Sequence, residues 1–132
     1  MWIGTPYRHQ ASLRGVGCDC LGLVRGVWRD VVGAEPEGLP VYGADWGERD
    51  GGEALIERAG RYLRAIDIAE AIAGDVLVFR WRPASIAKHM GILTGGSSFI
   101  HAWEHAGVVE VPLIAAWRRR IAAALRFPAR RD

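Results

Sequence analysis

The chain has 132 residues, half of them hydrophobic, which suits one compact domain over residues 1–132 with a core of its own. The formal net charge of +2 is too small to indicate a nucleic-acid partner, although arginines gather at 118–120 and 130–131. No apolar run approaches the roughly eighteen residues of a membrane span, and the N-terminus lacks the pattern of a signal peptide. We therefore expect neither membrane insertion nor nucleic-acid binding, and work outside the cytoplasm would need another delivery route.

The first segment, residues 2–10, has the sequence WIGTPYRHQ. Gly4, Thr5 and Pro6 predict an irregular or extended conformation that leads Tyr7 towards the cysteines. Because the chain starts abruptly with an apolar Trp-Ile pair, we expect that a further helix precedes it in the domain.

A glycine-rich turn then runs into an amphipathic helix that we expect to begin at Cys20 and to end near Gly33. Asp19 is a favoured N-cap residue, because its carboxylate can accept from the free N–H groups of the first turn. Gly22 and Gly26 each weaken a helix by about 1 kcal/mol, so something should pack closely against that side. The apolar stripe consists of Cys20, Leu23, Val24, Val27, Trp28 and Val31.

Cys20 at the helix start is a candidate nucleophile. A thiol at the start of a helix lies at the positive end of the helix dipole, which lowers its pKa, and this location leaves the sulfur partly exposed. The alternative is a packing role, since free cysteines are among the most buried residues. Cys18 and Cys20 do not form a disulfide framework. The pair could instead hold a metal with some of the four histidines, but the ligands of a zinc site are usually spaced more widely than in Cys-x-Cys. A reactive thiol without metal is favoured.

Residues 35–52 are rich in Gly, Pro and Asp and predict a long loop that serves as a wall or lid. Asp50 can cap a second helix, whose inward stripe would be Leu55, Ile56, Ala59, Tyr62 and Leu63.

After a turn at Gly74-Asp75 the pattern changes to short β-branched or aromatic runs separated by turns. Helices followed by an antiparallel meander indicate an α+β domain with the Cys20 helix against one face of the sheet. The strands are expected at 76–81, 90–93, 98–103, 108–111 and 121–127, with a short helical turn at 114–117.

A cysteine nucleophile needs a base, and the base needs an orienting group. If residues 94–96 form a three-residue hairpin loop, His89 lies directly opposite His101 and both rings project from one face. A two-residue loop at Gly95-Gly96 would send them to opposite faces, and the sequence permits either. His105 lies in a segment that predicts an exposed turn, and His9 could lie at the rim of the site.

Several segments, taken in chain order, resemble the NlpC-type cysteine peptidases, and in particular the branch found in phage tails and gene transfer particles. The resemblance implies a papain-like α+β fold, with N-terminal helices packed on an antiparallel sheet. It also implies cleavage in the stem peptides of peptidoglycan, commonly between D-glutamate and a diamino acid. The matching segments are 2–10, 19–24, 74–79, 89–92 and 99–102, with a similar ending at 117–120 and 126–128.

Carried over by position, Cys20 matches the nucleophile of the family, His89 its base and His101 its orienting residue. Tyr7 matches a tyrosine that lines the site. We expect the Cys20 backbone N–H and the Tyr7 hydroxyl to stabilise the oxyanion. The residue after the nucleophile is often a small hydroxyl in the family, whereas here it is Leu21, which puts the usual substrate contacts in doubt.

Tyr7 and Asp19 are thus the candidate substrate or oxyanion residues beside the triad of Cys20, His89 and His101. The function predicted is a thiol endopeptidase that needs no metal or organic cofactor. Its partners would be peptidoglycan stem peptides and phage-like tail or hub proteins, and a tail would deliver it to the periplasm and cell wall. The alternatives are a structural tail component, with a misaligned or covered triad, and a thiol acyltransferase or amidase.

Overall fold

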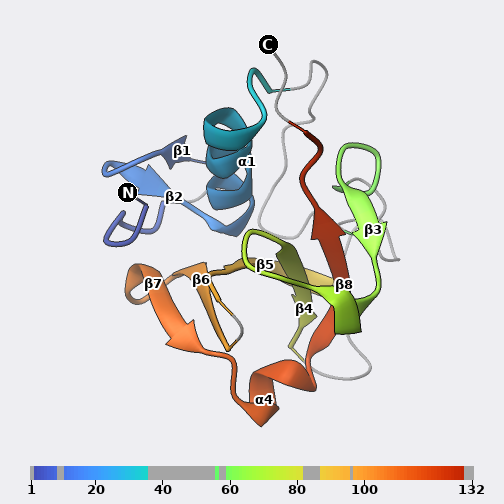
Figure 1. Ribbon diagram of the computed structural model, residues 1–132. Coiled ribbons are helices and arrows are strands. Elements are labelled where there is room, and N and C mark those ends of the chain that lie inside the picture. The colour runs from blue at the N-terminus through green and yellow to red at the C-terminus, as the bar shows by residue number, and fades with distance from the viewer. Residues whose placement is uncertain are drawn as a thin grey trace.

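The computed structural model describes residues 2–8, 11–35, 56, 59–81, 87–95 and 97–129. Helix α1 (Cys20–Val31) covers one face of a six-stranded antiparallel sheet, and the short helix α4 (Ala115–Arg118) lies against the other face (Figure 1). The predicted α+β architecture is confirmed. Most of the loop predicted at 35–52, and Asp50 with most of the helix that it would cap, lie outside the described residues.

The sheet order is β3-β8-β4-β5-β6-β7. Strands β4 to β7 form the predicted meander, and β8 returns to pair with β4. Strand β3 and the β1–β2 pair were not predicted, because pieces of two or three residues carry no usable periodicity. The bounds are β1 Ser12–Leu13, β2 Gly17–Cys18, β3 Arg64–Ile66, β4 Val76–Arg80, β5 Ala87–Leu93, β6 Ser98–Trp103, β7 Gly107–Pro112 and β8 Ile121–Arg126, with a 3-10 turn η1 at Ile68–Glu70.

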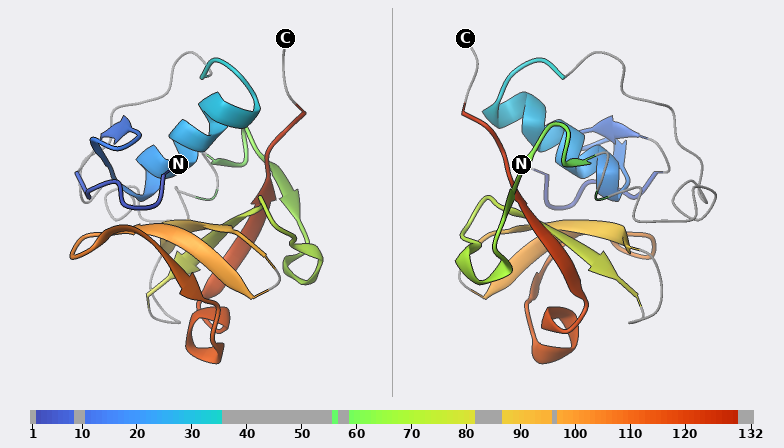
Figure 2. Two further views of the ribbon diagram at one scale, coloured as in Figure 1. Left: turned by 60° about the vertical axis from the view of Figure 1, so that its left-hand side comes forward. Right: turned by 90° about the vertical axis from the view of Figure 1, so that its right-hand side faces the viewer.

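Two apolar layers lie on the two faces of the sheet, because side chains alternate along each strand. Met90 and Ile92 of β5 belong to the layer beneath α1, together with Leu23. Leu93 of the same strand belongs to the second layer, on the side of α4. Figure 2 shows the helix and α4 on opposite sides of the curved sheet. A residue's position along β5 therefore decides which of the two layers it enters.

The start of α1 agrees with the prediction. The Asp19 carboxylate accepts a 2.7 Å hydrogen bond from the Gly22 N–H and caps the helix. The predicted stripe is wrong at Val31, which is 43% exposed, whereas Val32 at the C-cap is buried. Since Trp28 is buried, Val32 one turn further continues the buried line and Val31 falls at its edge.

Both glycines of α1 meet a closely packed neighbour, as predicted. A Cβ at Gly22 would lie 1.8 Å from the carbonyl oxygen of Ala11, and one at Gly26 would lie 2.0 Å from the Trp2 ring. The Trp2 indole N–H also donates to Asp30 at 2.9 Å. The N-terminal segment is therefore held against the helix at these positions.

An ion pair joins the start of β4 to the end of β8. The Arg126 guanidinium donates to both oxygens of Asp75, at 2.9 and 2.8 Å. Burial raises the pKa of Asp75, but the hydrogen bonds from Arg126 and from the Ile72 backbone outweigh it and lower the pKa overall. The predicted turn at 74–75 is present, with Gly74 at a φ of 92°. The carboxylate thus fixes the turn against the last strand.

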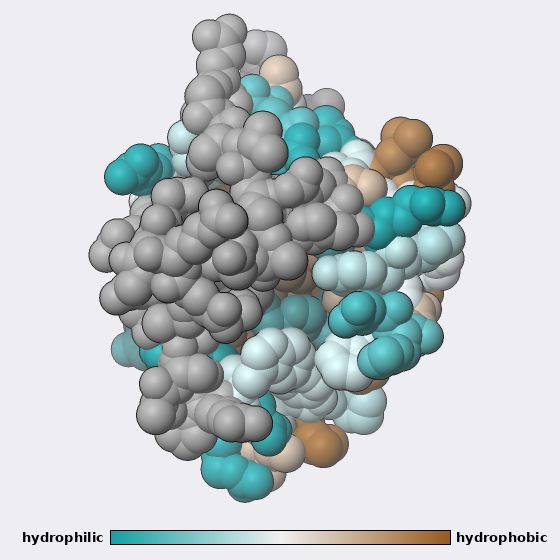
Figure 3. All heavy atoms as spheres, turned by 180° about the vertical axis from the view of Figure 1, so that it is seen from behind, coloured by the Kyte–Doolittle hydropathy of each residue, from teal (hydrophilic) through white to brown (hydrophobic). Residues whose placement is uncertain are grey.

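Outside the core, large apolar side chains are exposed at scattered positions, among them Leu13, Ile72 and Ile114. On the face shown in Figure 3, the hydrophobic residues of the described part form separate spots among hydrophilic ones. Within the described ranges, no helix is both long enough and apolar enough to cross a bilayer.

Gly26→Ala should destabilise the protein, although Ala in a helix interior is normally favoured over Gly by about 1 kcal/mol. The new methyl group would displace the Trp2 ring from α1. Urea unfolding measures the effect. In a Trp2→Ala background the same substitution should become neutral or stabilising, and a gain in stability in the wild-type background would refute the close contact.

Candidate active site

The thiol of Cys20 lies where the start of α1 meets β5. The side chain is partly exposed, and its sulfur accepts hydrogen bonds from the backbone N–H groups of Met90 and Leu21. The amide nitrogen of Met90 is bonded to the carbonyl carbon of His89. The sulfur therefore lies beside the peptide group that joins His89 to Met90.

The two candidate histidines are in direct contact. Nε2 of His89 lies 2.7 Å from Nδ1 of His101, and the rings are nearly perpendicular, at 82°. Both side chains are buried, with exposed fractions of 5% and 3%. The expectation that the rings project from one face of the sheet is confirmed. We also expect that face to meet Cys20, but the rings lie among Phe79, Phe99 and Trp117 on the α4 side, whereas Cys20 packs in the layer beneath α1.

The strand register that brings the rings together differs from both alternatives considered for the hairpin. Ile92 pairs with Ile100 and Leu93 with Phe99, and the Thr94 N–H donates to the Ser98 carbonyl. The three-residue loop expected at 94–96 is therefore wrong by two positions in register, and the two-residue loop by one. A shift by two leaves every side chain on its predicted face. Continued along the strands, this register puts His101 diagonally beside His89 instead of directly opposite.

Aromatic rings enclose the histidine pair on the α4 side of the sheet. Trp81 stacks on His89 with ring centres 4.9 Å apart, and Trp117 of α4 lies 5.3 Å from the His101 ring. Phe79 and Phe99 complete the enclosure. The sequence prediction missed Trp81 and Trp117. Alternation along β4 was the available signal for Trp81, since it shares odd positions with Phe79.

Burial makes the histidines weak bases at rest. Burial and the neighbouring His101 lower the pKa of His89 to about 3, and burial lowers that of His101 to about 4. Both rings are therefore neutral near pH 7, and one ring nitrogen donates to the other across the 2.7 Å contact.

The predicted lowering of the Cys20 pKa is wrong. Burial, followed by the charge of the Asp19 carboxylate, raises the pKa of Cys20 to about 12, although the backbone N–H groups at the sulfur lower it. The dipole of the helix start is thus outweighed by desolvation and by the capping carboxylate. The resting site contains a neutral thiol and two neutral imidazoles.

The sequence model of the NlpC/P60 family matches residues 4–126. The chain belongs to the NlpC/P60 family. The predicted family and papain-like α+β fold are thereby confirmed, and the solved NlpC/P60 domain of the peptidoglycan hydrolase SagA shares the fold with a TM-score of 0.60 and 25% identity. The alignment covers 96% of this chain and 90% of that domain. An NLP/P60 family protein from Staphylococcus aureus aligns with a TM-score of 0.61 at 21% identity, over 99% of this chain and 38% of its own.

Two curated Escherichia coli proteins also resemble the chain. Murein DD-endopeptidase MepS/Murein LD-carboxypeptidase is 28% identical over 130 residues, which cover 98% of this chain and 59% of that protein. Murein DD-endopeptidase MepH is 28% identical over 127 residues, covering 94% of this chain and 41% of the relative. The chain thus spans only about half the length of these two relatives.

Tyr7 is held near the thiol by the segment that precedes α1. The Cys18 N–H donates to the Pro6 carbonyl and the Arg8 N–H donates to the Cys18 carbonyl, so Tyr7 runs beside β2. Burial and then the nearby Cys20 raise the pKa of Tyr7 to about 12. The phenol is therefore protonated and can donate a hydrogen bond.

The other singled-out residues have structural or peripheral positions. Asp19 is buried as the helix cap, and Cys18 is fully buried in the core. His105 is exposed in the turn between β6 and β7, and His9 lies outside the described residues. Within the described part of the chain, no three potential ligands from His, Cys, Asp and Glu gather at one point.

The free energy of unfolding should fall as the pH is lowered from about 7 to about 4. The unfolded chain binds protons at an ordinary histidine pKa near 6.5, whereas the folded pair stays neutral down to about 3 to 4. Urea unfolding at a series of pH values measures the slope. His101→Gln should flatten it and His105→Gln, at an exposed position, should not. A slope that both variants leave unchanged would rule out the buried pair as its source.

Iodoacetamide should label Cys20 before the fully buried Cys18, at a rate that continues to rise above pH 9 because the pKa is about 12. Asp19→Asn keeps a capping oxygen but removes the negative charge, so it should lower the pKa of Cys20 and accelerate labelling. Mass spectrometry of timed samples gives both rates. A labelling rate that levels off below pH 8 would contradict the raised pKa.

Proposed function

We propose that the chain is a thiol endopeptidase that cleaves the stem peptides of peptidoglycan with Cys20, His89 and His101. The observation that carries the proposal is the 2.7 Å contact between the two buried histidines. The Cys20 sulfur approaches the same strand from the α1 side, at the Met90 N–H, so the mechanism requires the His89 ring to reach the thiol at the end of the strand. Membership of the NlpC/P60 family supports it, as do relatives named murein endopeptidases.

We infer from the contact between the rings which atoms of the base would act. Because Nε2 of His89 faces Nδ1 of His101, the nitrogen of His89 that takes the thiol proton is Nδ1. For Nδ1 to be unprotonated, Nε2 must carry the hydrogen and donate it to Nδ1 of His101. His101 then holds the productive tautomer of His89 and stabilises the imidazolium that forms.

The neutral resting state implies that proton transfer accompanies attack. Cys20 attacks the amide carbonyl while His89 takes the thiol proton, which His89 then gives to the leaving amine. The Cys20 backbone N–H at the helix start donates to the oxyanion, and the Tyr7 hydroxyl provides a second donor. Water hydrolyses the thioester, and no metal or cofactor takes part. The rings of Trp81 and Trp117 keep water away from the charge that develops on His89.

The finer setting that we propose is a phage or phage-like tail that carries the domain to the wall. It is supported by the sequence resemblance of the segments at 117–120 and 126–128 to that branch. In this setting, tail or hub proteins would be the partners and the periplasm the place of action. A mainly structural tail component, or an acyltransferase with the same triad, would differ in the products released from the wall.

Wild-type protein should release peptides with new amino ends from purified peptidoglycan and leave the glycan strands intact. Cys20→Ala should abolish release, His89→Ala should reduce it by at least about 10³-fold, and His101→Ala should cost less, about 10²-fold. Mass spectrometry of the soluble products measures this. Cys18→Ala is the matched thiol control and should retain activity.

Wall cleavage that persists undiminished in Cys20→Ala would refute the proposal. Release of disaccharides without peptide cleavage would assign a different activity. If the isolated chain is inactive, the assembled particle is the appropriate sample for the same product analysis.

A further inference from the structure

Two tryptophans are exposed on the α4 side of the sheet, next to the histidine pair. Trp81 follows β4 and is 38% exposed, and Trp103 ends β6 and is 36% exposed. Their ring centres lie 6.0 Å apart and their planes meet at 65°, so the two indoles form an aromatic corner. Trp81 stacks on His89, and Trp103 lies 6.0 Å from the His101 ring. The aromatic corner therefore borders the candidate site where the site reaches solvent.

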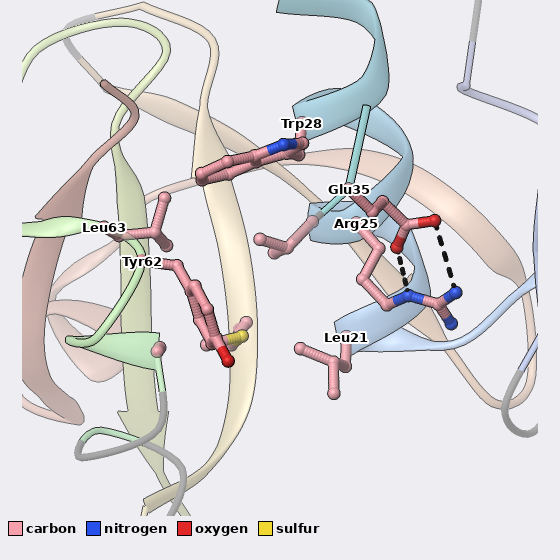
Figure 4. Close-up of a pocket in the computed structure, with 9 residues that line it drawn as sticks. Leu21, Arg25, Trp28, Glu35, Tyr62 and Leu63 are labelled. Atoms are coloured by element: carbon pink, nitrogen blue, oxygen red, sulfur yellow. Dashed lines mark hydrogen bonds and ion pairs between the residues drawn. The ribbon is translucent and has the colours of Figure 1, made fainter. Parts of the chain in front are cut away.

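The indole N–H groups distinguish this corner from the tryptophans packed against α1. Trp2 and Trp28 each donate the indole N–H to a protein oxygen, at 2.9 and 3.0 Å. Figure 4 shows Trp28 at one end of an apolar pocket between α1, β5 and residues 59–63, on the opposite face of the sheet. Within the described residues, neither Trp81 nor Trp103 donates its indole N–H to an acceptor. The corner thus offers two exposed rings together with two free donors.

The turn from β6 to β7 adds polar groups beside the aromatic corner. Glu104 and His105 are exposed, and the His105 ring lies 5.7 Å from that of Trp103. The Ala106 N–H donates to the Trp103 carbonyl at 3.0 Å, and Gly107 completes the turn with a φ of 74°. Because the backbone of the turn is already closed, its side chains need little ordering to bind a ligand.

The same turn lies close to the N-terminal segment that carries Tyr7. Two backbone hydrogen bonds join that segment to Val108 of β7, which Figure 1 shows beside it. Behind burial and the charges of Cys20 and Asp19, the Glu104 carboxylate also contributes to the raised pKa of Tyr7. A molecule bound at the candidate site can therefore extend over the aromatic corner without leaving the protein surface.

We propose that the aromatic corner and Glu104 form a binding subsite for an N-acetylated amino sugar of the kind that makes up glycan strands. The inference rests on the proposed function and adds a second part of the substrate. The C–H groups on one face of a pyranose ring carry a small positive charge and pack on the negative face of an indole. Hydroxyl groups of the sugar donate to the Glu104 carboxylate, and the acetamido carbonyl accepts from an indole N–H.

The mixture of groups on this surface favours a sugar over an apolar protein segment. An apolar segment would cover two N–H donors and a carboxylate without giving them partners, which costs free energy for each unpaired group. A pyranose ring has apolar faces and a rim of hydroxyl and amide groups, so it satisfies the rings and the polar groups together. The angle of 65° between the indoles lets one ring hold a face of the sugar while the other meets its edge.

Titration of the isotope-labelled wild-type protein with chitotetraose tests the proposal, because this oligomer of N-acetylglucosamine carries no peptide. NMR resolves the indole N–H signals of the six tryptophans, and single substitutions assign them. We expect the signals of Trp81 and Trp103 to shift saturably and those of Trp2 and Trp28 to stay in place. Maltotetraose, which lacks the acetamido group, should bind at least about threefold more weakly.

Variants of the corner should change the affinity for chitotetraose. Trp103→Ala should weaken binding about tenfold, and Trp103→Phe should weaken it less, because an aromatic face remains. Glu104→Gln should weaken it about threefold, since a charged acceptor is replaced by a neutral one. Ile72→Ala is the matched control, because Ile72 is 60% exposed and lies near the opposite end of β4.

Absence of saturable binding to the wild type would overturn the proposal, as would unchanged affinity in a folded Trp103→Ala protein. Signals of Trp81 and Trp103 that move only with protein concentration would assign the surface to a protein contact instead. Circular dichroism checks the fold of each variant, and the wild-type shifts stand even if Trp103→Ala is unstable. Failure of the peptidase proposal gives a different result, since sugar binding without wall cleavage would refute catalysis and leave the subsite intact.

Discussion

The pairing of β5 with β6 is the constraint on which the candidate site depends. His89 and His101 meet only because the register puts their odd-numbered positions on one face. A slip by one residue would move one ring into the layer beneath α1 and break the contact. Gly91 follows His89 by two residues on β5, and a Cβ at this position would lie 2.7 Å from the Phe99 ring of β6. The absent side chain lets β6 approach closely enough for the rings to touch.

A second constraint acts from the opposite side of the sheet, through the start of α1. Asp19 caps the helix and so fixes where Cys20 meets β5, but the same carboxylate raises the pKa of the thiol. The local order of the helix and the acidity of the candidate nucleophile are therefore in conflict. Such conflicts are expected where a functional residue lies at a structurally demanding position. In the mechanism that we propose, a neutral His89 suits a thiol that keeps its proton until attack.

The strand positions and the start of the helix could be predicted from local sequence patterns. The alternation in β4 and β6 gave strand positions to within a residue or two, and Asp19 identified the helix start. The hairpin register could not be obtained, because several loop lengths are compatible with the run of glycine and serine after Thr94. The predicted direction of the Cys20 pKa shift was wrong for a related reason. Burial is its largest cause, and burial depends on segments that are distant in the sequence. Leu21 and Tyr62 line the same apolar pocket, and no periodic spacing in the sequence indicates that these two residues lie close together.

The neutral state of Cys20 also affects how fast its sulfur is oxidised. Peroxide and disulfides react with the thiolate form, so a thiol with a pKa of about 12 is oxidised slowly at neutral pH. Cys18 is the only other cysteine in the chain and is fully buried, which withdraws it from thiol exchange. A domain that waits in an oxidising medium before it meets its substrate would thus preserve its sulfur in reduced form without a disulfide or a bound metal to protect it.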